Sequence, residues 1–222
     1  MKKGLTELVF ILDRSGSMCG LEDDTIGGFN GMIRKQKEAE GEAFVTTVLF
    51  DDRYEVIHDR VPLKQMKPLT TKEYYVRGCT ALLDALGRTI TKVRNTGYRL
   101  PEEERPEKVI VVITTDGFEN ASEKFSYAQI RHMTEDMQKH YNWEFIFLGA
   151  NMDAVAEGAR FGIRKDRSVT FANDGEGIRK NYQVLGETLK CMRAPGMRVD
   201  GSWKKEIEEE TKKRSRSGRK RN

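Results

Sequence analysis

Hydroxyl and carboxyl side chains gather in three separate stretches of this chain. Asp13, Ser15 and Ser17 belong to Asp-Arg-Ser-Gly-Ser, Thr80 to Gly-Cys-Thr-Ala-Leu, and Asp116 to Thr-Thr-Asp-Gly. Oxygen ligands of this kind suit hard cations, and Mg²⁺ in particular takes octahedral oxygen ligands and retains several of its waters. These residue types therefore predict a divalent-cation site for Mg²⁺ or Mn²⁺, with Asp13, Ser15, Ser17, Thr80 and Asp116 as its metal-site residues.

Each stretch alone has an ordinary structural explanation. Ser and Asp side chains commonly cap helices, so the first stretch and Thr80 could simply begin the helices that follow them. Asp116-Gly117 is also a common turn dipeptide. Capping needs alone rarely produce three oxygen-rich loops that all follow a buried strand or precede a helix. The combination therefore favours a metal site.

Two apolar runs deliver the two aspartates. Residues 8–12 are uninterrupted apolar residues that end at Asp13, and residues 109–113 form a second run shortly before Asp116. Such runs are typical of strands buried on both faces of a parallel sheet. In open α/β sheets, ligands bind beyond the carboxyl ends of the strands, where the strand order reverses. We therefore expect Asp13 and Asp116 to lie at one edge of a sheet.

The pattern Asp-x-Ser-x-Ser, then Thr, then Asp resembles the metal-ion-dependent adhesion site of the von Willebrand factor A family, and all five positions match. The resemblance extends to compact prokaryotic and phage-type members of the family and covers about residues 5–195. The resemblance implies a metal-dependent protein-binding module. It also implies that Ser15, Ser17 and at times Thr80 bind the cation directly, whereas Asp13 and Asp116 hold metal-bound waters. A cation held by neutral hydroxyls would accept a carboxylate from a protein partner.

The order of apolar patterns predicts an α/β fold that is doubly wound and Rossmann-like. We expect a mostly parallel central sheet with one antiparallel edge strand and helices on both faces. Gly27, Gly28 and Gly31 weaken the expectation for the first helix, because glycine is a poor helix former. The expected strands are 5–12, 44–50, 54–58, 109–113, 143–150 and 168–171, and the expected helices are 26–33, 82–93, 122–140, 153–161 and one after Asp174.

Composition indicates one domain followed by a charged tail. The chain has 222 residues, of which 37% are hydrophobic, enough for one sizeable core. We expect a domain at 1–199 and a disordered basic tail at 200–222. Residues 212–222 carry seven basic side chains and no acidic one, and removing them from the net charge of +4 leaves −3. The tail could bind nucleic acid or another acidic surface, or only keep the protein soluble.

Targeting and redox signals favour the cytoplasm. Glu7 interrupts the first apolar segment and no small-residue cleavage site follows, so we expect no signal peptide. No apolar stretch approaches the roughly 18 residues that span a membrane. The three cysteines are widely spaced and form no Cys-x-x-Cys pair, which fits a reducing compartment.

Enzyme motifs are missing from the sequence, and we expect no enzymatic activity. A dehalogenase-type phosphatase would need a second aspartate where Ser15 stands, and neither a P-loop nor a Gly-x-Ser-x-Gly elbow is present. The alternative is a metal-dependent hydrolase or phosphotransfer enzyme, for which Glu119 is the one candidate base. A further alternative is a nucleic-acid-associated adaptor that docks through its tail.

Overall fold

The computed structural model describes residues 1–218, and its centre is a six-stranded sheet in the order β3-β2-β1-β4-β5-β6. All neighbouring strands are parallel except β2 and β3, which form an antiparallel pair at one edge. The predicted sheet and its antiparallel edge strand are therefore confirmed. The strands are β1 (Lys2–Asp13), β2 (Glu42–Phe50), β3 (Tyr54–Pro62), β4 (Pro106–Thr115), β5 (Trp143–Ala150) and β6 (Ser168–Phe171).

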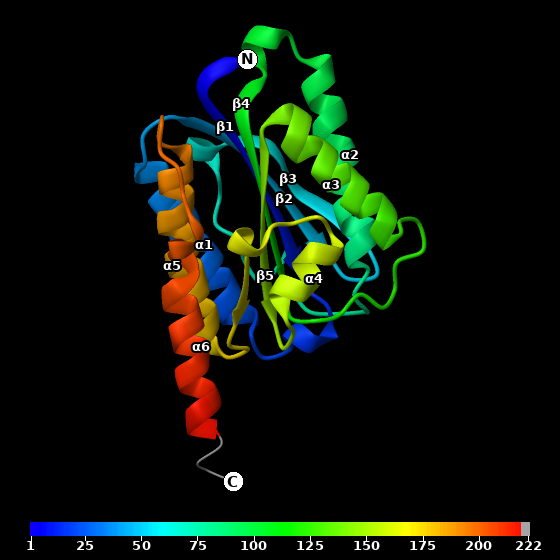
Figure 1. Ribbon diagram of the computed structural model, residues 1–222, viewed down its shortest axis with the longest axis vertical. Coiled ribbons are helices and arrows are strands. Elements are labelled where there is room, and N and C mark those ends of the chain that lie inside the picture. Colours follow the sequence, from blue (N-terminus) through cyan, green and yellow to red (C-terminus); the bar gives the residue numbers. More distant parts are fainter. Residues whose placement is uncertain (219–222) are drawn as a thin grey trace.

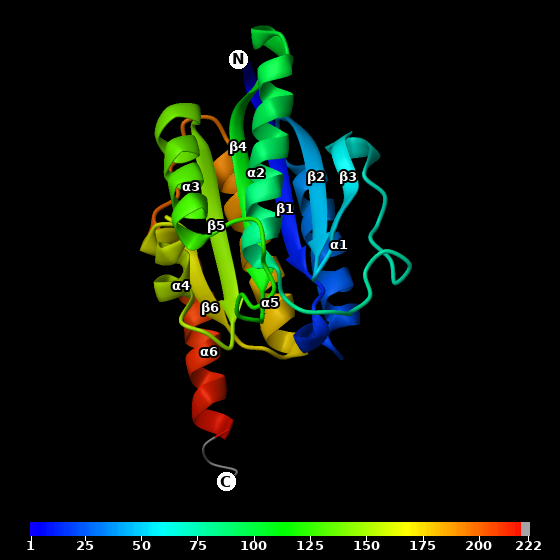
Figure 2. The ribbon, with the colours of Figure 1, turned by 90° about the vertical axis from the view of Figure 1, so that its right-hand side faces the viewer.

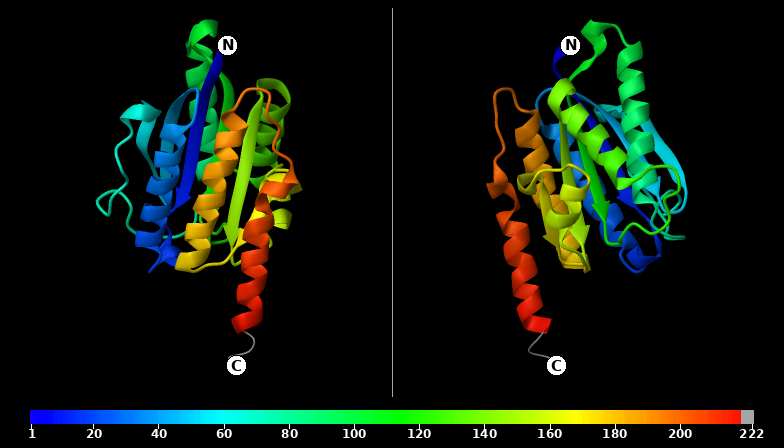
Figure 3. Two further views of the ribbon diagram at one scale, coloured as in Figure 1. Left: turned by 90° about the vertical axis from the view of Figure 1, so that its left-hand side faces the viewer. Right: turned by 45° about the vertical axis from the view of Figure 1, so that its right-hand side comes forward.

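Helices cover both faces of the sheet, as the doubly wound fold requires (Figures 1 and 2). One layer holds α1 (Glu22–Glu38), α5 (Gly175–Arg193) and α6 (Lys205–Gly218), and the left-hand view of Figure 3 shows these three side by side. The other layer holds α2 (Leu82–Arg99) and α3 (Tyr127–Tyr141), with the short α4 (Ala154–Arg160) beside them. Among residues 1–218, no helix is long and apolar enough to span a bilayer.

The strand order reverses between β1 and β4, which places a ligand-binding crevice at their carboxyl ends. The chain moves from β1 outward to β2 and β3, then crosses to β4 on the other side and continues outward. Leu12 pairs with Thr114, so Asp13 lies level with the end of β4. The expectation that Asp13 and Asp116 share one edge is confirmed.

Successive side chains of β1 point to opposite faces of the sheet and contribute to a hydrophobic core on each face. Phe10 packs with the layer of α1 and α5, whereas Val9 and Ile11 pack with the layer of α2 and α3. All three side chains are buried, because a parallel strand in the middle of such a sheet has no solvent-facing side. Phe145 and Phe147 of β5 belong to the second core, as their alternation in the sequence predicts.

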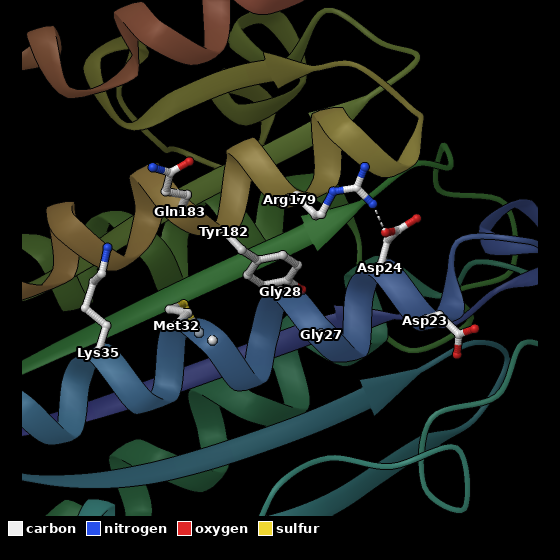
Figure 4. Close-up of a pocket in the computed structure, with 10 residues that line it drawn as sticks. Asp23, Asp24, Gly27, Gly28, Met32, Lys35, Arg179, Tyr182 and Gln183 are labelled. Atoms are coloured by element: carbon white, nitrogen blue, oxygen red, sulfur yellow. Dashed lines mark hydrogen bonds and ion pairs between the residues drawn. The ribbon is translucent and has the colours of Figure 1, made fainter.

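Helix α1 contains its glycines without a break, which the sequence alone left in doubt. A Cβ on Gly28 would lie 2.4 Å from Cδ2 of Tyr182, so α5 lies too close for any side chain at this position. Figure 4 shows the Tyr182 ring over Gly28, in a groove between α1 and α5. The ion pair between Arg179 and Asp24 crosses this groove to the right of the ring. Close packing against α5 compensates for the low helix propensity of glycine.

The prediction of a disordered tail at 200–222 is wrong for residues 200–218, because Gly201–Lys204 forms a 3-10 helix and Lys205–Gly218 forms α6. Ile207 is 2% exposed and packs with the core beneath α1 and α5. The Trp203 indole N–H donates to the carbonyl of Asp166 at 2.8 Å. The buried Ile207 and the partly buried Trp203 dock the segment against the core, so the domain does not end at 199. The remaining residues of the predicted tail, 219–222, lie outside the described part.

Helix α3 begins later than predicted, at Tyr127 rather than 122. Ser126 and Gln129 form a capping box there, each side chain bonding the other's backbone N–H. Before it, the carboxylate of Asp84 accepts hydrogen bonds from the backbone N–H groups of Lys124 at 2.9 Å and Phe125 at 3.0 Å. These contacts hold the preceding residues as a loop beside the edge that bears the predicted metal-site residues.

Candidate metal centre

Asp13 is fixed from several sides at the end of β1. Its Oδ1 accepts the Ser15 N–H at 2.7 Å, and its Oδ2 accepts the Thr115 hydroxyl at 2.5 Å. The hydroxyl of Tyr74, a fully buried side chain, donates to the Asp13 carbonyl at 2.6 Å. Burial raises the pKa of Asp13 to about 6, and the bonds from Thr115 and Ser15 offset part of that rise. The carboxylate is therefore held in place in a nearly dry environment.

Three hydroxyls and the second aspartate converge on the same point. The Ser15 and Ser17 Oγ atoms are 3.1 Å apart, and the Thr80 hydroxyl donates to Ser15 Oγ at 3.1 Å. Ser17 Oγ donates to Oδ1 of Asp116 at 2.5 Å. All five residues predicted from the sequence thus meet in one oxygen cluster, with Asp13 joined to it through Ser15. Asn173, which follows β6, donates to Oδ2 of Asp116 at 3.2 Å.

The hydroxyl oxygens lie close enough together to share one cation. Ser15 Oγ lies 3.1 Å from both Ser17 Oγ and Thr80 Oγ1. Neighbouring ligands of an octahedral Mg²⁺ with metal–oxygen distances of 2.0–2.1 Å are about 2.9 Å apart. The donor set of neutral hydroxyls and carboxylates is also that of a hard cation. The residues present therefore fit Mg²⁺ or Mn²⁺.

Gly117 leaves room at the cluster. A Cβ at this position would lie 2.9 Å from Thr80 Oγ1 and 3.2 Å from Ser17 Oγ. Any other residue would bring carbon against the oxygens that face one another here. The glycine is thus required by the close approach of the Thr80 and Ser17 hydroxyls.

A partly buried ionic network packs against the loop of residues 13–17, the first loop of the cluster. Arg14 and Asp51 are both fully buried, and the Arg14 Nε donates to Asp51 Oδ2 at 2.9 Å. Arg77 donates to the same oxygen at 2.7 Å, and both arginines pair with Glu55. The arginine hydrogen bonds lower the pKa of Glu55 to about 2. The network holds four charged side chains in one arrangement, where each charge has an opposite partner.

The same network connects the first loop to the loop of Thr80. The carbonyl of Asp51 accepts the Ala81 N–H at 3.0 Å, and the Arg77 N–H donates to the carbonyl of Arg14 at 2.9 Å. Between them, Gly78 has a φ of +67° and would place a Cβ 1.9 Å from Asp52 Oδ1, so only glycine fits this turn. The Asp51 backbone therefore helps to hold the segment that carries Thr80.

Asn120 and Glu119 connect the loop that follows Asp116, the third loop, to the segment of Thr80, the second loop. Asn120 Oδ1 accepts the Thr80 N–H at 2.9 Å, and the Asn120 N–H donates to the carbonyl of Thr80 at 3.0 Å. Glu119 Oε2 accepts the Leu83 N–H at 2.8 Å in the first turn of α2, while its Oε1 accepts the N–H groups of residues 121 and 122. Both carboxylate oxygens of Glu119 are thus used in fixing backbone.

Sequence reasoning missed Asp51, Arg77, Asn120 and Asn173. Asp51 offered a signal, since it directly follows the apolar strand β2, as Asp13 follows β1. The other three lie in loops whose paths the sequence did not predict. Their roles arise from contacts between segments that are distant in the sequence, such as Arg77 with Asp51, Thr80 with Asn120 and Asp116 with Asn173.

Comparison of the sequence with family models and with curated proteins finds no match. Solved structures do match the fold. Proximal thread matrix protein 1 from the mussel byssus is 14% identical with a TM-score of 0.58, and 84% of this chain covers 46% of that one. A form of the same protein with a zinc-occupied MIDAS motif is 15% identical with a TM-score of 0.55, at 83% and 46% coverage.

Two further solved structures match the fold of this chain. The von Willebrand factor type A protein from Catenulispora acidiphila is 14% identical with a TM-score of 0.57, at 84% and 43% coverage. The ArnB paralog VWA2 from Sulfolobus acidocaldarius is 19% identical with a TM-score of 0.51, at 82% and 44% coverage. The chain spans less than half the length of these proteins. It has the von Willebrand factor A fold, as the resemblance of its motifs implied.

Proposed function

We propose that this protein is a divalent-metal-dependent protein-binding module, which ligates an acidic residue of its partner through the cluster of Asp13, Ser15, Ser17, Thr80 and Asp116. The observation that carries the proposal is the convergence of three hydroxyls at 3.1 Å spacings, between two carboxylates, on the crevice edge of the sheet. The zinc-occupied MIDAS motif of the mussel protein supports a divalent cation on this fold. We take the cation to be Mg²⁺ or Mn²⁺, because all of the side-chain donors in the cluster are oxygens.

The neutral hydroxyls and the charged carboxylates of the cluster would have different roles. The hydroxyl oxygens of Ser15, Ser17 and Thr80 would hold the cation without neutralising it. Asp13 and Asp116 would orient metal-bound waters, since each carboxylate is already fixed by protein donors. A bound dication would supply positive charge and an open position for a carboxylate. A partner's Asp, Glu or terminal carboxylate would fill that position.

The alternative of a metal-dependent hydrolase or phosphotransfer enzyme is the weaker proposal. Such an enzyme needs a general base with a free lone pair near the reacting water. Glu119, the one candidate from the sequence, accepts four hydrogen bonds, from three backbone N–H groups and the Ser122 hydroxyl. Its contacts support a role in holding the third loop against α2.

Metal binding is the first test. Calorimetric titration with MgCl₂ or MnCl₂ should show one site in the full chain, with CaCl₂ binding more weakly. Thr80→Ala and Ser15→Ala should each weaken Mg²⁺ binding at least about tenfold, or about 1.4 kcal/mol. Thr71→Ala removes the same hydroxyl at an exposed position and should change nothing. Equal Mg²⁺ affinity in Thr80→Ala and Thr71→Ala would contradict the assignment.

Carboxylate ligation is the second test. A pull-down from the native host in Mg²⁺ and in EDTA should retain a partner only with metal, and Thr80→Ala should lose it. Changing the partner's acidic residues one at a time to the matching amides should then identify one whose loss removes the metal dependence. If every amide variant still binds with undiminished metal dependence, the partner does not ligate the cation through a side-chain carboxylate.

A further inference from the structure

Helix α6 separates its charges along its length. Glu206, Glu208, Glu209 and Glu210 occupy its first half, whereas the basic residues 212–214 and 216 follow in its second half. Each half carries the sign that its end of the helix dipole favours. Lys212 and Lys213 are exposed, and no ion pair joins either to a carboxylate among the residues whose side chains the structure describes.

The strand register places the basic half of α6 at the metal-bearing edge. The Thr211 hydroxyl donates to the carbonyl of Thr170 in β6. Thr170 is level with Gly149 in β5, and Gly149 is level with Thr115 in β4, the residue that bonds Asp13. Along the strand direction, Thr211 is therefore level with the end of β4, and the helix residues that follow it extend past the edge that carries the oxygen cluster. Figures 1, 2 and 3 show α6 extending beyond the edge at which the strand arrows end.

Arg214 fastens this part of the helix to the loop that reaches the cluster. Its guanidinium pairs with Asp174 at 2.6 Å and with Glu176, both at the start of α5, and with Glu210 at 3.0 Å within α6. Asn173, the neighbour of Asp174, bonds Asp116 of the cluster. Helix α6 is thus held in a fixed position relative to the metal centre, with its two exposed lysines directly before Arg214.

From these positions we infer that the basic end of α6 is a second contact for the partner bound at the metal centre, and that this partner is an acidic protein surface. The inference rests on the proposed function. From β6, beside α6, to β1 is three strand spacings, or about 14 Å. A standard interface of about 800 Å² per partner is wider than that. One acidic surface can therefore give a carboxylate to the cation and further carboxylates to Lys212 and Lys213.

Charge patterning favours an acidic protein over nucleic acid. Nucleic-acid-binding domains carry a continuous basic stripe along which the phosphate backbone runs. Here only Thr211 separates the two lysines from Glu208, Glu209 and Glu210 in the preceding turn of the helix, and the rest of the chain outside 212–222 has a net charge of −3. A phosphate chain following α6 would meet those glutamates. A protein with a local cluster of carboxylates avoids them.

The test uses poly-L-glutamate as the acidic probe and a single-stranded DNA oligonucleotide of equal charge as its competitor, both at low salt. Binding of poly-L-glutamate should require Mg²⁺, and Lys212→Glu/Lys213→Glu should weaken it at least about tenfold. Lys3→Glu/Lys64→Glu makes the same charge change at exposed positions near the opposite edge, and should weaken it less than about threefold. Circular dichroism checks α6, and the milder Lys212→Gln/Lys213→Gln should give an intermediate loss.

The outcomes separate this inference from the proposed function. Mg²⁺-dependent binding that is indifferent to Lys212 and Lys213 would overturn the inference and leave the metal-dependent module standing. Binding that depends on the lysines but not on Mg²⁺ would overturn the inference and count against the module as well. Tighter, lysine-dependent binding of the DNA oligonucleotide would show that the surface is built for nucleic acid. Equal losses in the two double variants would mean that net charge alone is sensed.

Discussion

Asp51→Ala should destabilise the protein strongly, because it leaves the guanidinium of Arg14 inside the protein without its buried carboxylate partner. Both side chains are fully buried, and Arg14 Nε lies 2.9 Å from Asp51 Oδ2. Removing one partner of a buried ion pair costs about 3–5 kcal/mol. For a domain of this size that corresponds to a fall of about 6–20 °C in melting temperature. Glu55, which also pairs with Arg14, should keep the loss toward the lower end.

Thermal unfolding followed by circular dichroism measures the effect, with Asp59→Ala as the matched control. Asp59 pairs with Lys92 at 2.7 Å, but its side chain is 58% exposed, so its loss should cost less than about 1 kcal/mol. Adding Arg14→Met to Asp51→Ala removes the unpaired charge and should recover part of the stability. The reasoning is refuted if Asp51→Ala unfolds no earlier than Asp59→Ala, or if Arg14→Met makes the first variant worse.

Three further predictions follow from other contacts. Gly117→Ala should weaken Mg²⁺ binding at least about tenfold in calorimetry with little change in melting temperature, since its Cβ would lie 2.9 Å from Thr80 Oγ1; unchanged affinity would argue against a cation between these loops. Gly28→Ala should cost about 1–3 kcal/mol in urea unfolding, because its Cβ would lie 2.4 Å from Cδ2 of Tyr182. Gly27→Ala, with open space around it, should instead stabilise by about 0.5–1 kcal/mol, and two equal effects would show that the close packing does not matter. Hydrogen bonds from two arginines lower the pKa of Glu55 from 4.5 to about 2, so the stability that its carboxylate contributes is present above pH 4.5 and is lost as the pH falls toward 2. The partial exposure of Glu55 limits this contribution to about 1 kcal/mol. Acid unfolding of Glu55→Gln should therefore show a correspondingly smaller loss of stability between pH 4.5 and about 2 than acid unfolding of the unchanged protein.

Local residue types determined most of the fold and the members of the cluster. Uninterrupted apolar runs identify β1 and β4, because a strand buried on both faces has no polar positions. The residue that ends such a run must lie at the crevice edge, which is why Asp13 and Asp116 could be placed from the sequence. The five oxygen side chains did not depend on knowing any loop path. Metal binding, the partner's carboxylate and a cytoplasmic location stay predictions.

Only the tertiary structure determined how those residues are held and what lies beside them. The path of each loop depends on contacts between distant segments, such as Arg14 with Asp51 and Thr80 with Asn120, and these pairings leave no local pattern. The same holds for the region from residue 200 on, where composition indicated disorder because charges outnumber apolar residues. Ile207, buried against the core, shows why that indication failed. Composition averages over a segment, whereas docking needs only a few apolar side chains that meet a complementary surface, and that surface exists only after the sheet and its helices have assembled.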